Sequence, residues 1–168
     1  MEKVFSVGFS FFVVIGSALM LLWLYRGPFF VPTKRKHVPR IIDMLAVKQG
    51  EKIADLGSGD GRLMIAIVEA GAEAHGYEHN PLLVMRSRKN FEKLGITDRA
   101  FVYMENFWNA DISKYDAIVI YGISYIMPRL ERKLRAELRP GARVVSYSFP
   151  FPTWEHEKED KRVYLYRK

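Results

Sequence analysis

Cysteine is absent from the 168 residues of the chain. Its absence excludes disulfide bonds, zinc sites with cysteine ligands and catalytic cysteine nucleophiles, including a thiolate that attacks cytosine. The histidines, which are His37, His75, His79 and His156, are scattered without the spacing of metal ligands. The sequence therefore predicts no metal site.

A long basic tract is also missing, although the net charge is +7. Five basic residues directly follow an apolar N-terminal segment, and the others are scattered over expected helix faces, where they are solvated. The five are Arg26, Lys34, Arg35, Lys36 and Arg40. No nucleic-acid motif accompanies them, so no nucleic-acid partner is expected. The cluster either binds anionic lipid or only fixes membrane topology.

The apolar segment is an uncharged run of 22 residues from Val4 to Tyr25. A helix of that length spans roughly 33 Å, which matches the hydrocarbon core of a bilayer. A cleaved signal peptide would end in small residues, whereas this run ends in Leu-Trp-Leu-Tyr. We therefore predict a single-pass transmembrane anchor over residues 1–27 and a folded domain over residues 28–168. Because the basic residues follow the run, the domain is expected on the cytoplasmic side of the membrane.

Beyond the anchor, strand-like and helix-like patterns alternate, which predicts an α/β domain with a mostly parallel sheet and an antiparallel last strand. Helices are expected at about 35–47, Gly61–Ala70, Pro81–Leu94 and Pro128–Leu138. Strands are expected at Lys52–Leu56, Ala74–Tyr77, Phe101–Met104, Tyr115–Tyr121, Ala142–Phe149 and Arg162–Tyr166.

A glycine-rich loop follows the first expected strand and opens the next helix. It has the pattern D-x-G-x-G-x-G, over Asp55, Gly57, Ser58, Gly59, Asp60 and Gly61. Glycines let the backbone turn sharply and approach a ligand closely. Glu78 ends the second strand, 19 residues after Gly59, where an acidic side chain can accept hydrogen bonds from ribose hydroxyls. The alternative is a tight strand-to-helix turn without a ligand.

The acidic residue before the glycines discriminates between nucleotide-like ligands. A carboxylate at Asp55 would repel the pyrophosphate of a dinucleotide. S-adenosylmethionine (SAM) has no phosphate and carries an ammonium and a sulfonium, so it favours acidic surroundings. SAM is therefore the expected cofactor.

The loop resembles motif I of class I SAM-dependent methyltransferases, and Glu78 resembles their acidic ribose-binding residue. The resemblance extends to the lysine methyltransferases of the adenine nucleotide translocase and the ATP synthase c subunit, with their prokaryotic relatives. It covers nearly the whole chain and implies a Rossmann-like fold. The shared features are the N-terminal hydrophobic segment, residues 30–33 (FVPT), 55–62 (DLGSGDGR), 139–146 (RPGARVVS), 149–150 (FP) and 163–167 (VYLYR).

The resemblance also assigns roles. It implies that Asp55, Gly57 and Gly59, with the rest of the loop, surround the methionine part of SAM and that Glu78 holds the ribose. Relatives usually carry an acidic residue near the adenine, where this chain has Asn106. The chain is also short after the fifth strand, so a sheet trimmed below the usual seven strands is expected.

The acceptor side is less defined. Tyr121 is the candidate for lining an acceptor channel, and an ordinary aromatic at the end of a strand is the alternative. Asp60 either helps to place the cofactor or acceptor amine or caps the next helix. The resemblance to lysine methyltransferases makes a protein-lysine N-methyltransferase for a membrane-associated protein the leading hypothesis. The alternatives are a methyltransferase for a small lipophilic acceptor, such as a quinone or lipid, and a catalytically silent SAM-binding module.

Overall fold

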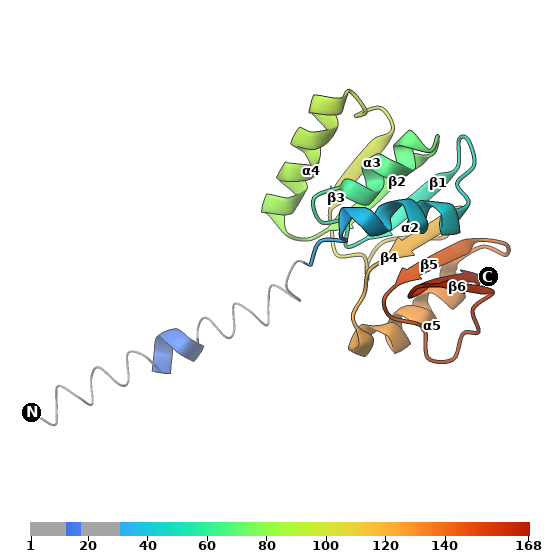
Figure 1. Ribbon diagram of the computed structural model, residues 1–168. Helices are drawn as coiled ribbons and strands as arrows, with labels where there is room; N and C mark the ends of the chain where they lie inside the picture. Colours follow the sequence, from blue (N-terminus) through green and yellow to red (C-terminus); the bar gives the residue numbers. More distant parts are fainter. Residues whose placement is uncertain (1–12, 18–30) are drawn as a thin grey trace, which may run out of the picture. The chain divides into compact units, whose positions relative to one another are not determined.

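The computed structural model describes residues 13–17 and 31–168 (Figure 1). The chain divides into two compact units, Met1–Val31 and Pro32–Lys168. Residues 13–17 are helical, and the rest of the predicted membrane span, Val4 to Tyr25, lies outside the described residues. Among the residues that are described, no helix is long and apolar enough to cross a bilayer.

The second unit alternates strands and helices along the chain, as predicted. Its helical elements are η1 (Arg35–His37), α2 (Val38–Leu45), α3 (Arg62–Glu69), α4 (Pro81–Leu94), η2 (Ser124–Ile126) and α5 (Met127–Glu137). Its strands are β1 (Lys52–Leu56), β2 (Glu73–Glu78), β3 (Ala100–Met104), β4 (Ala117–Ile120), β5 (Arg143–Tyr147), β6 (Lys158–Asp160) and β7 (Val163–Arg167).

The strands form one seven-stranded sheet in the order β3-β2-β1-β4-β5-β7-β6. The first five strands run parallel, while β7 is antiparallel to β5 and β6 is antiparallel to β7. The predicted α/β class with an antiparallel end is confirmed. The expectation of a trimmed sheet is wrong, because the short polar segment Lys158–Asp160 pairs with β7 as an edge strand.

Three predicted boundaries shift for local reasons. The helix expected at 35–47 is split into a 3₁₀ turn and α2, and Pro39, which lacks an N–H, lies in the first turn of α2. The strand expected at Ala142–Phe149 ends at Tyr147, because Ser148 takes a left-handed conformation with φ of 73°. The strand expected at Tyr115–Tyr121 spans only Ala117–Ile120, so Tyr121 begins the following loop.

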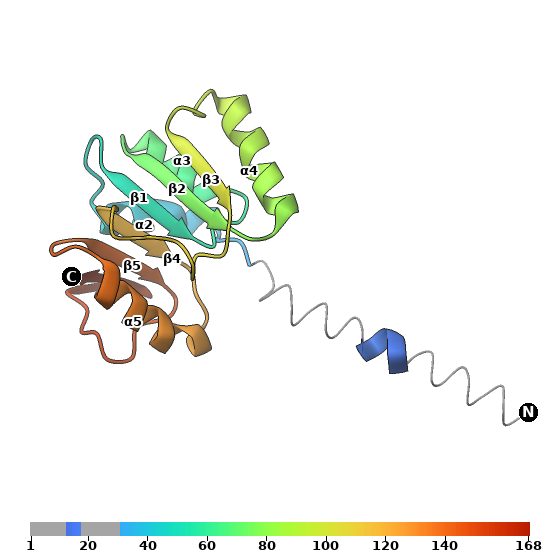
Figure 2. The ribbon, with the colours of Figure 1, turned by 180° about the vertical axis from the view of Figure 1, so that it is seen from behind.

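The sheet is the middle of three layers. Buried apolar side chains of α2, α3 and α4 pack on one face, and those of α5 pack on the other. Figures 1 and 2 show these two faces in turn. Strands β1 and β4 are buried almost throughout and lie where the strand order reverses. In open α/β sheets, ligands bind at the carboxyl ends of the strands at this reversal.

One buried ion pair joins α2 to the centre of the sheet. Arg143 of β5 donates through Nε to the carbonyl of Leu45 at 2.8 Å, and its Nη2 lies 2.5 Å from a carboxylate oxygen of Glu51. Both charged side chains are largely buried. Arg143 therefore satisfies a carbonyl at the C-terminus of α2 as well as the carboxylate.

Replacing Arg143 with Met should lower the free energy of unfolding by about 3 kcal/mol, because Glu51 is then left buried without its cation. Arg167→Met is the matched control, since the Arg167–Glu157 pair is nearly half exposed and should contribute less than about 1 kcal/mol. Urea unfolding of both variants measures the difference. Equal losses would contradict the role assigned to Arg143.

Candidate functional site

The glycine loop lies between the end of β1 and the start of α3, at the carboxyl edge of the sheet. Its backbone is tied to the end of β2: the N–H groups of Gly57 and Ser58 donate to the carbonyl of Tyr77 at 2.9 and 3.1 Å. Gly57, Gly59 and Gly61 all have positive φ angles. The loop thus has the sharp turn that the sequence predicts.

Two glycines are required by close packing. A Cβ on Gly61 would lie 2.7 Å from the Phe91 ring, in a backbone conformation with φ of 78°. A Cβ on Gly76 of β2 would lie 2.5 Å from Ser58 Oγ and would also collide with the sulfur of Met64. Gly76 was not among the predicted site residues, because its role depends on how closely the loop approaches a neighbouring strand.

Glu78 connects three segments of the site. One of its carboxylate oxygens accepts a hydrogen bond from the N–H of Gly59 at 3.1 Å, and the other accepts from the N–H of Asn80 at 2.8 Å. His79 Nδ1 lies 3.6 Å from the same carboxylate. The backbone carbonyl of Glu78 also accepts from the N–H of Glu105, which follows β3. Glu78 therefore positions the glycine loop, the start of α4 and the loop after β3.

Helix α4 holds the glycine loop from the other side. Ser87 Oγ donates to the carbonyl of Gly59 at 2.9 Å, and Asn90 Nδ2 donates to the carbonyl of Asp60 at 3.1 Å. Ser87 is fully buried. Sequence reasoning missed both residues, because polar positions on a helix do not reveal which loop they face.

Asp60 is buried and paired with Arg62. The guanidinium contacts both carboxylate oxygens, at 2.9 and 2.6 Å, and this contact lowers the pKa of Asp60. The capping alternative for Asp60 is wrong, since the N-cap of α3 is Gly61 and no side chain caps this helix. Arg62 Nη1 also donates to the carbonyl of Thr33 at 2.7 Å. Arg62 thereby attaches the start of the domain to the glycine loop.

Asp55 is also buried, beneath the loop. Burial raises the pKa of its carboxyl to about 7, with the neighbouring carboxylates of Glu78 and Asp60 acting in the same direction. Three acidic side chains, Asp55, Asp60 and Glu78, thus surround one loop, each less than a tenth exposed. The cluster has excess negative charge that a cationic ligand would neutralise.

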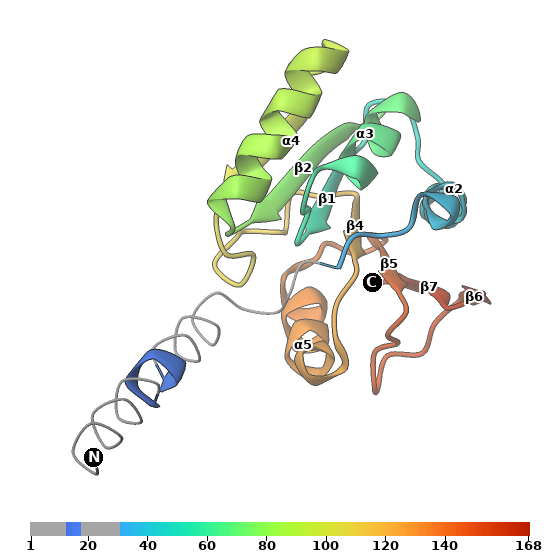
Figure 3. The same ribbon diagram turned by 60° about the vertical axis from the view of Figure 1, so that its left-hand side comes forward.

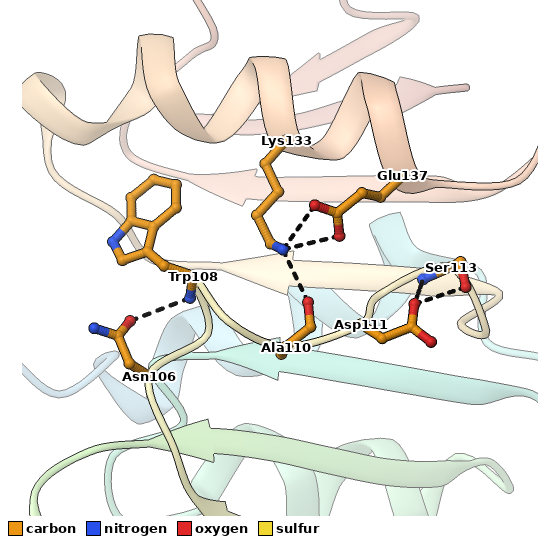
Figure 4. Close-up of polar contacts among 7 residues, drawn as sticks. All are labelled: Asn106, Trp108, Ala110, Asp111, Ser113, Lys133 and Glu137. Carbon is orange, nitrogen blue, oxygen red and sulfur yellow. Dashed lines mark hydrogen bonds and ion pairs between the residues drawn. The ribbon is translucent and has the colours of Figure 1, made fainter.

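Asn106 lies in the loop after β3 and follows Glu105, whose N–H donates to the carbonyl of Glu78. Its side chain is exposed, and its Oδ1 accepts a hydrogen bond from the N–H of Trp108 at 3.1 Å (Figure 4). The carbonyl of the Asn106 side chain is therefore used within the loop, and the Nδ2 group remains as a donor.

The loop that carries Asn106 is attached to α5. Lys133 Nζ donates to the carbonyl of Ala110 at 2.8 Å and pairs with both carboxylate oxygens of Glu137 (Figure 4). Arg129 of the same helix lies 4.2 Å from the centre of the Trp108 ring. These contacts fix the loop relative to the sheet, and sequence reasoning did not identify them.

Tyr121 lies just after β4, half-buried. Its ring packs edge-on against Tyr147 at the end of β5, with centroids 4.7 Å apart, and Tyr147 lies 5.4 Å from the ring of His37. Nδ1 of His37 is buried and has no hydrogen-bond partner among the described residues. Burial lowers the pKa of His37, and the nearby Lys36, Arg40 and Lys34 lower it further. The three rings gather at the same carboxyl edge as the glycine loop.

The raised pKa of Asp55 has a measurable consequence for stability. The folded state retains the Asp55 proton up to about pH 7, whereas the unfolded chain loses it near pH 4. The free energy of unfolding should therefore fall as pH rises from 4 to 7, by at most about 1.4 kcal/mol per pH unit from this group. Urea unfolding at several pH values should show this slope for the wild type. The Asp55→Asn variant should lack the part of this slope that comes from Asp55. If the free energy of unfolding depends on pH in the same way in both proteins, the raised pKa of Asp55 is contradicted.

Comparisons with known proteins agree with this architecture. Residues 55–158 match the ANTKMT methyltransferase domain. In Mus musculus, the lysine N-methyltransferase of the ATP synthase c subunit is 39% identical over 160 residues, which cover 89% of this chain and 64% of the mouse protein. The chain thus spans less than two thirds of that relative's length. A protein-lysine N-methyltransferase of Saccharolobus islandicus is 34% identical, covering 82% of this chain and 91% of that protein.

Among solved structures, an RNA methyltransferase from Salinibacter ruber in complex with S-adenosyl-L-homocysteine has a TM-score of 0.76 and 31% identity. The alignment covers 82% of this chain and 92% of that one. The matched family domain begins at Asp55, the first residue of the glycine loop, and the similarity extends across the sheet. The chain therefore belongs to the ANTKMT methyltransferase family, whose members are SAM-dependent enzymes.

Proposed function

We propose that the chain transfers a methyl group from SAM to a lysine side chain of a membrane-associated protein. The observation that carries the proposal is the acidic glycine loop, in which Asp55, Asp60 and Glu78 are buried around one turn. The names of the mouse and Saccharolobus relatives, both lysine N-methyltransferases, support the acceptor class.

The site residues suit the parts of SAM in different ways. Asp55 and the loop would hold the methionine ammonium, because ion pairing also relieves repulsion among the carboxylates. Each carboxylate oxygen of Glu78 accepts one N–H and retains a lone pair for a ribose hydroxyl. Asn106, whose Nδ2 remains as a donor, suits a ring nitrogen of adenine. The cofactor supplies an electrophilic methyl group, and the protein supplies alignment and exclusion of water.

The aromatic group of Tyr121, Tyr147 and His37 is the proposed wall of the acceptor site. A lysine must lose its proton before it can act as a nucleophile, and an apolar wall disfavours the ammonium form. The ring of His37 adds to this wall through its contact with Tyr147, and its lowered pKa disfavours a positive charge there.

Tyr121→Ala should lower kcat/KM for the protein acceptor by about tenfold or more, which corresponds to about 1.4 kcal/mol of lost transition-state stabilisation. Tyr121→Phe keeps the packing against Tyr147 and should stay within about threefold of the wild type. The affinity for S-adenosylhomocysteine, measured by calorimetry, should be unchanged in both variants. A loss of cofactor affinity in Tyr121→Ala would contradict an acceptor-side role.

The proposed function is tested by methyl transfer from radiolabelled SAM into a membrane fraction, with the full chain as enzyme. We expect label in a discrete protein band that yields methylated lysine on hydrolysis. Glu78→Gln is the control: it preserves shape but loses the charged acceptor, which should weaken cofactor binding by about 10- to 100-fold.

Other distributions of label would identify other functions. Label confined to the lipid extract would replace the lysine proposal with a small lipophilic acceptor. Label in RNA would instead support the activity named for the Salinibacter protein. Tight binding of S-adenosylhomocysteine without transfer to any fraction would indicate a silent SAM-binding module.

A further inference from the structure

Large apolar side chains are exposed at one edge of the folded domain. Within Pro32–Lys168, Leu82, Met104 and Tyr125 are exposed by 68%, 63% and 73%, and Met85 by 50%. Leu82 and Met85 lie in the first two turns of α4 after β2, Met104 ends β3, and Tyr125 lies in η2 after β4. All four therefore lie at or just beyond the carboxyl ends of the strands, the edge that also carries the glycine loop. Figure 3 shows the start of α4 next to the end of β2 at this edge.

We call these four residues the apolar rim. Single exposed apolar side chains are common on soluble proteins, but several at one functional edge indicate an interaction surface. The opposite edge of the sheet, at the amino ends of the parallel strands, is less apolar. Among the described residues, its large exposed apolar side chain is Leu94, at the far end of α4.

Exposed basic residues accompany the apolar rim. Lys34, Arg35 and Lys36 lie at η1, which is connected to the glycine loop through the contact of Arg62 with Thr33. Arg86 follows Met85 on α4, and Arg129 lies near the start of α5. Apolar side chains surrounded by lysine and arginine are typical of a surface that contacts anionic lipid.

The short connection between the uncharged run and the folded domain also favours a lipid bilayer as the partner of the rim. The uncharged run ends at Tyr25, seven residues before Pro32, so a fully extended connection spans at most about 25 Å. Arg62 holds the carbonyl of Thr33 at 2.7 Å beside the glycine loop, so the chain enters the domain near the same carboxyl edge of the sheet that carries the apolar rim. A bilayer that holds the run would therefore lie within reach of this edge.

We propose that the apolar rim rests in the headgroup region of an anionic bilayer and so directs the glycine loop and the acceptor wall towards the membrane surface. The proposal rests on the membrane-associated function proposed above. It places the acceptor lysine at or near the headgroups rather than in a distant soluble domain. The basic residues supply electrostatic attraction that salt weakens, and the rim supplies insertion.

The absence of cysteine makes the test direct. Single cysteines at positions 82, 104 and 125 of the full chain can each carry an environment-sensitive fluorophore, with no competing thiol. Leu94→Cys is the matched control, because Leu94 is 52% exposed on the same helix as Leu82 and lies about 18 Å further along it. The labelled proteins are reconstituted into vesicles of phosphatidylcholine with and without phosphatidylglycerol and are isolated by flotation.

In vesicles that contain phosphatidylglycerol, we expect a blue shift and quenching by nitroxide lipids at positions 82, 104 and 125. Position 94 should remain in water, and high salt should weaken the signal at the other three. If the protein floats with the vesicles but the fluorophores at positions 82, 104 and 125 report water, the proposed contact of the rim is overturned, while membrane binding through the N-terminal run is supported. Protein that fails to float would overturn both the anchor and the rim. If the fluorescence shifts to the blue as the protein concentration rises in the absence of lipid, the surface binds a second copy of the chain instead.

Discussion

The arrangement of the site depends on the contact between Glu78 and the N–H groups of Gly59 and Asn80. A carboxylate that accepts two backbone donors is a strong, charge-assisted connection, and here it joins the turn after β1 to the turn after β2. The same turn brings Asp55 and Asp60 close to Glu78, so three acidic groups share one small volume. Arg62 neutralises Asp60, and the negative charge that remains at Asp55 and Glu78 can be neutralised by a cationic ligand or by protons.

The neighbouring elements limit the movement of this cluster. Ser87 and Asn90 hold the loop carbonyls from α4, while Arg62 connects Asp60 to the carbonyl of Thr33. Lys133 holds the loop after β3 against α5. Because such a site is organised before a ligand arrives, little binding free energy is lost in ordering it. The connection through Arg62 also means that the segment entering the domain and the cofactor loop are parts of one network.

The sequence predicted features that depend on local patterns and could not predict those that depend on tertiary contacts. The glycine loop and Glu78 were recognisable because strand, glycines and acid follow one another at fixed spacing. The edge strand Lys158–Asp160 was missed because a polar tripeptide has no apolar alternation. The partner of Asp60 could not be predicted from the sequence. Its carboxylate could either cap the next helix or pair with Arg62, two residues further on, and only the geometry of the turn shows that it pairs with Arg62. Ser87 and Gly76 acquire their roles only through the packing of α4 and β2 around the loop.

The central claim is that the buried carboxylates form a site for a cationic cofactor, and proton release on binding tests it most directly. Calorimetry of S-adenosylhomocysteine binding at pH 7, in buffers of different ionisation enthalpy, gives the number of protons exchanged. Because the pKa of Asp55 is about 7, the carboxyl is half protonated there, and an ammonium beside it should expel about 0.5 proton. We predict this release in the wild type and none in Asp55→Asn. Tight binding to the wild type with no proton release, or with proton uptake, would contradict the claim.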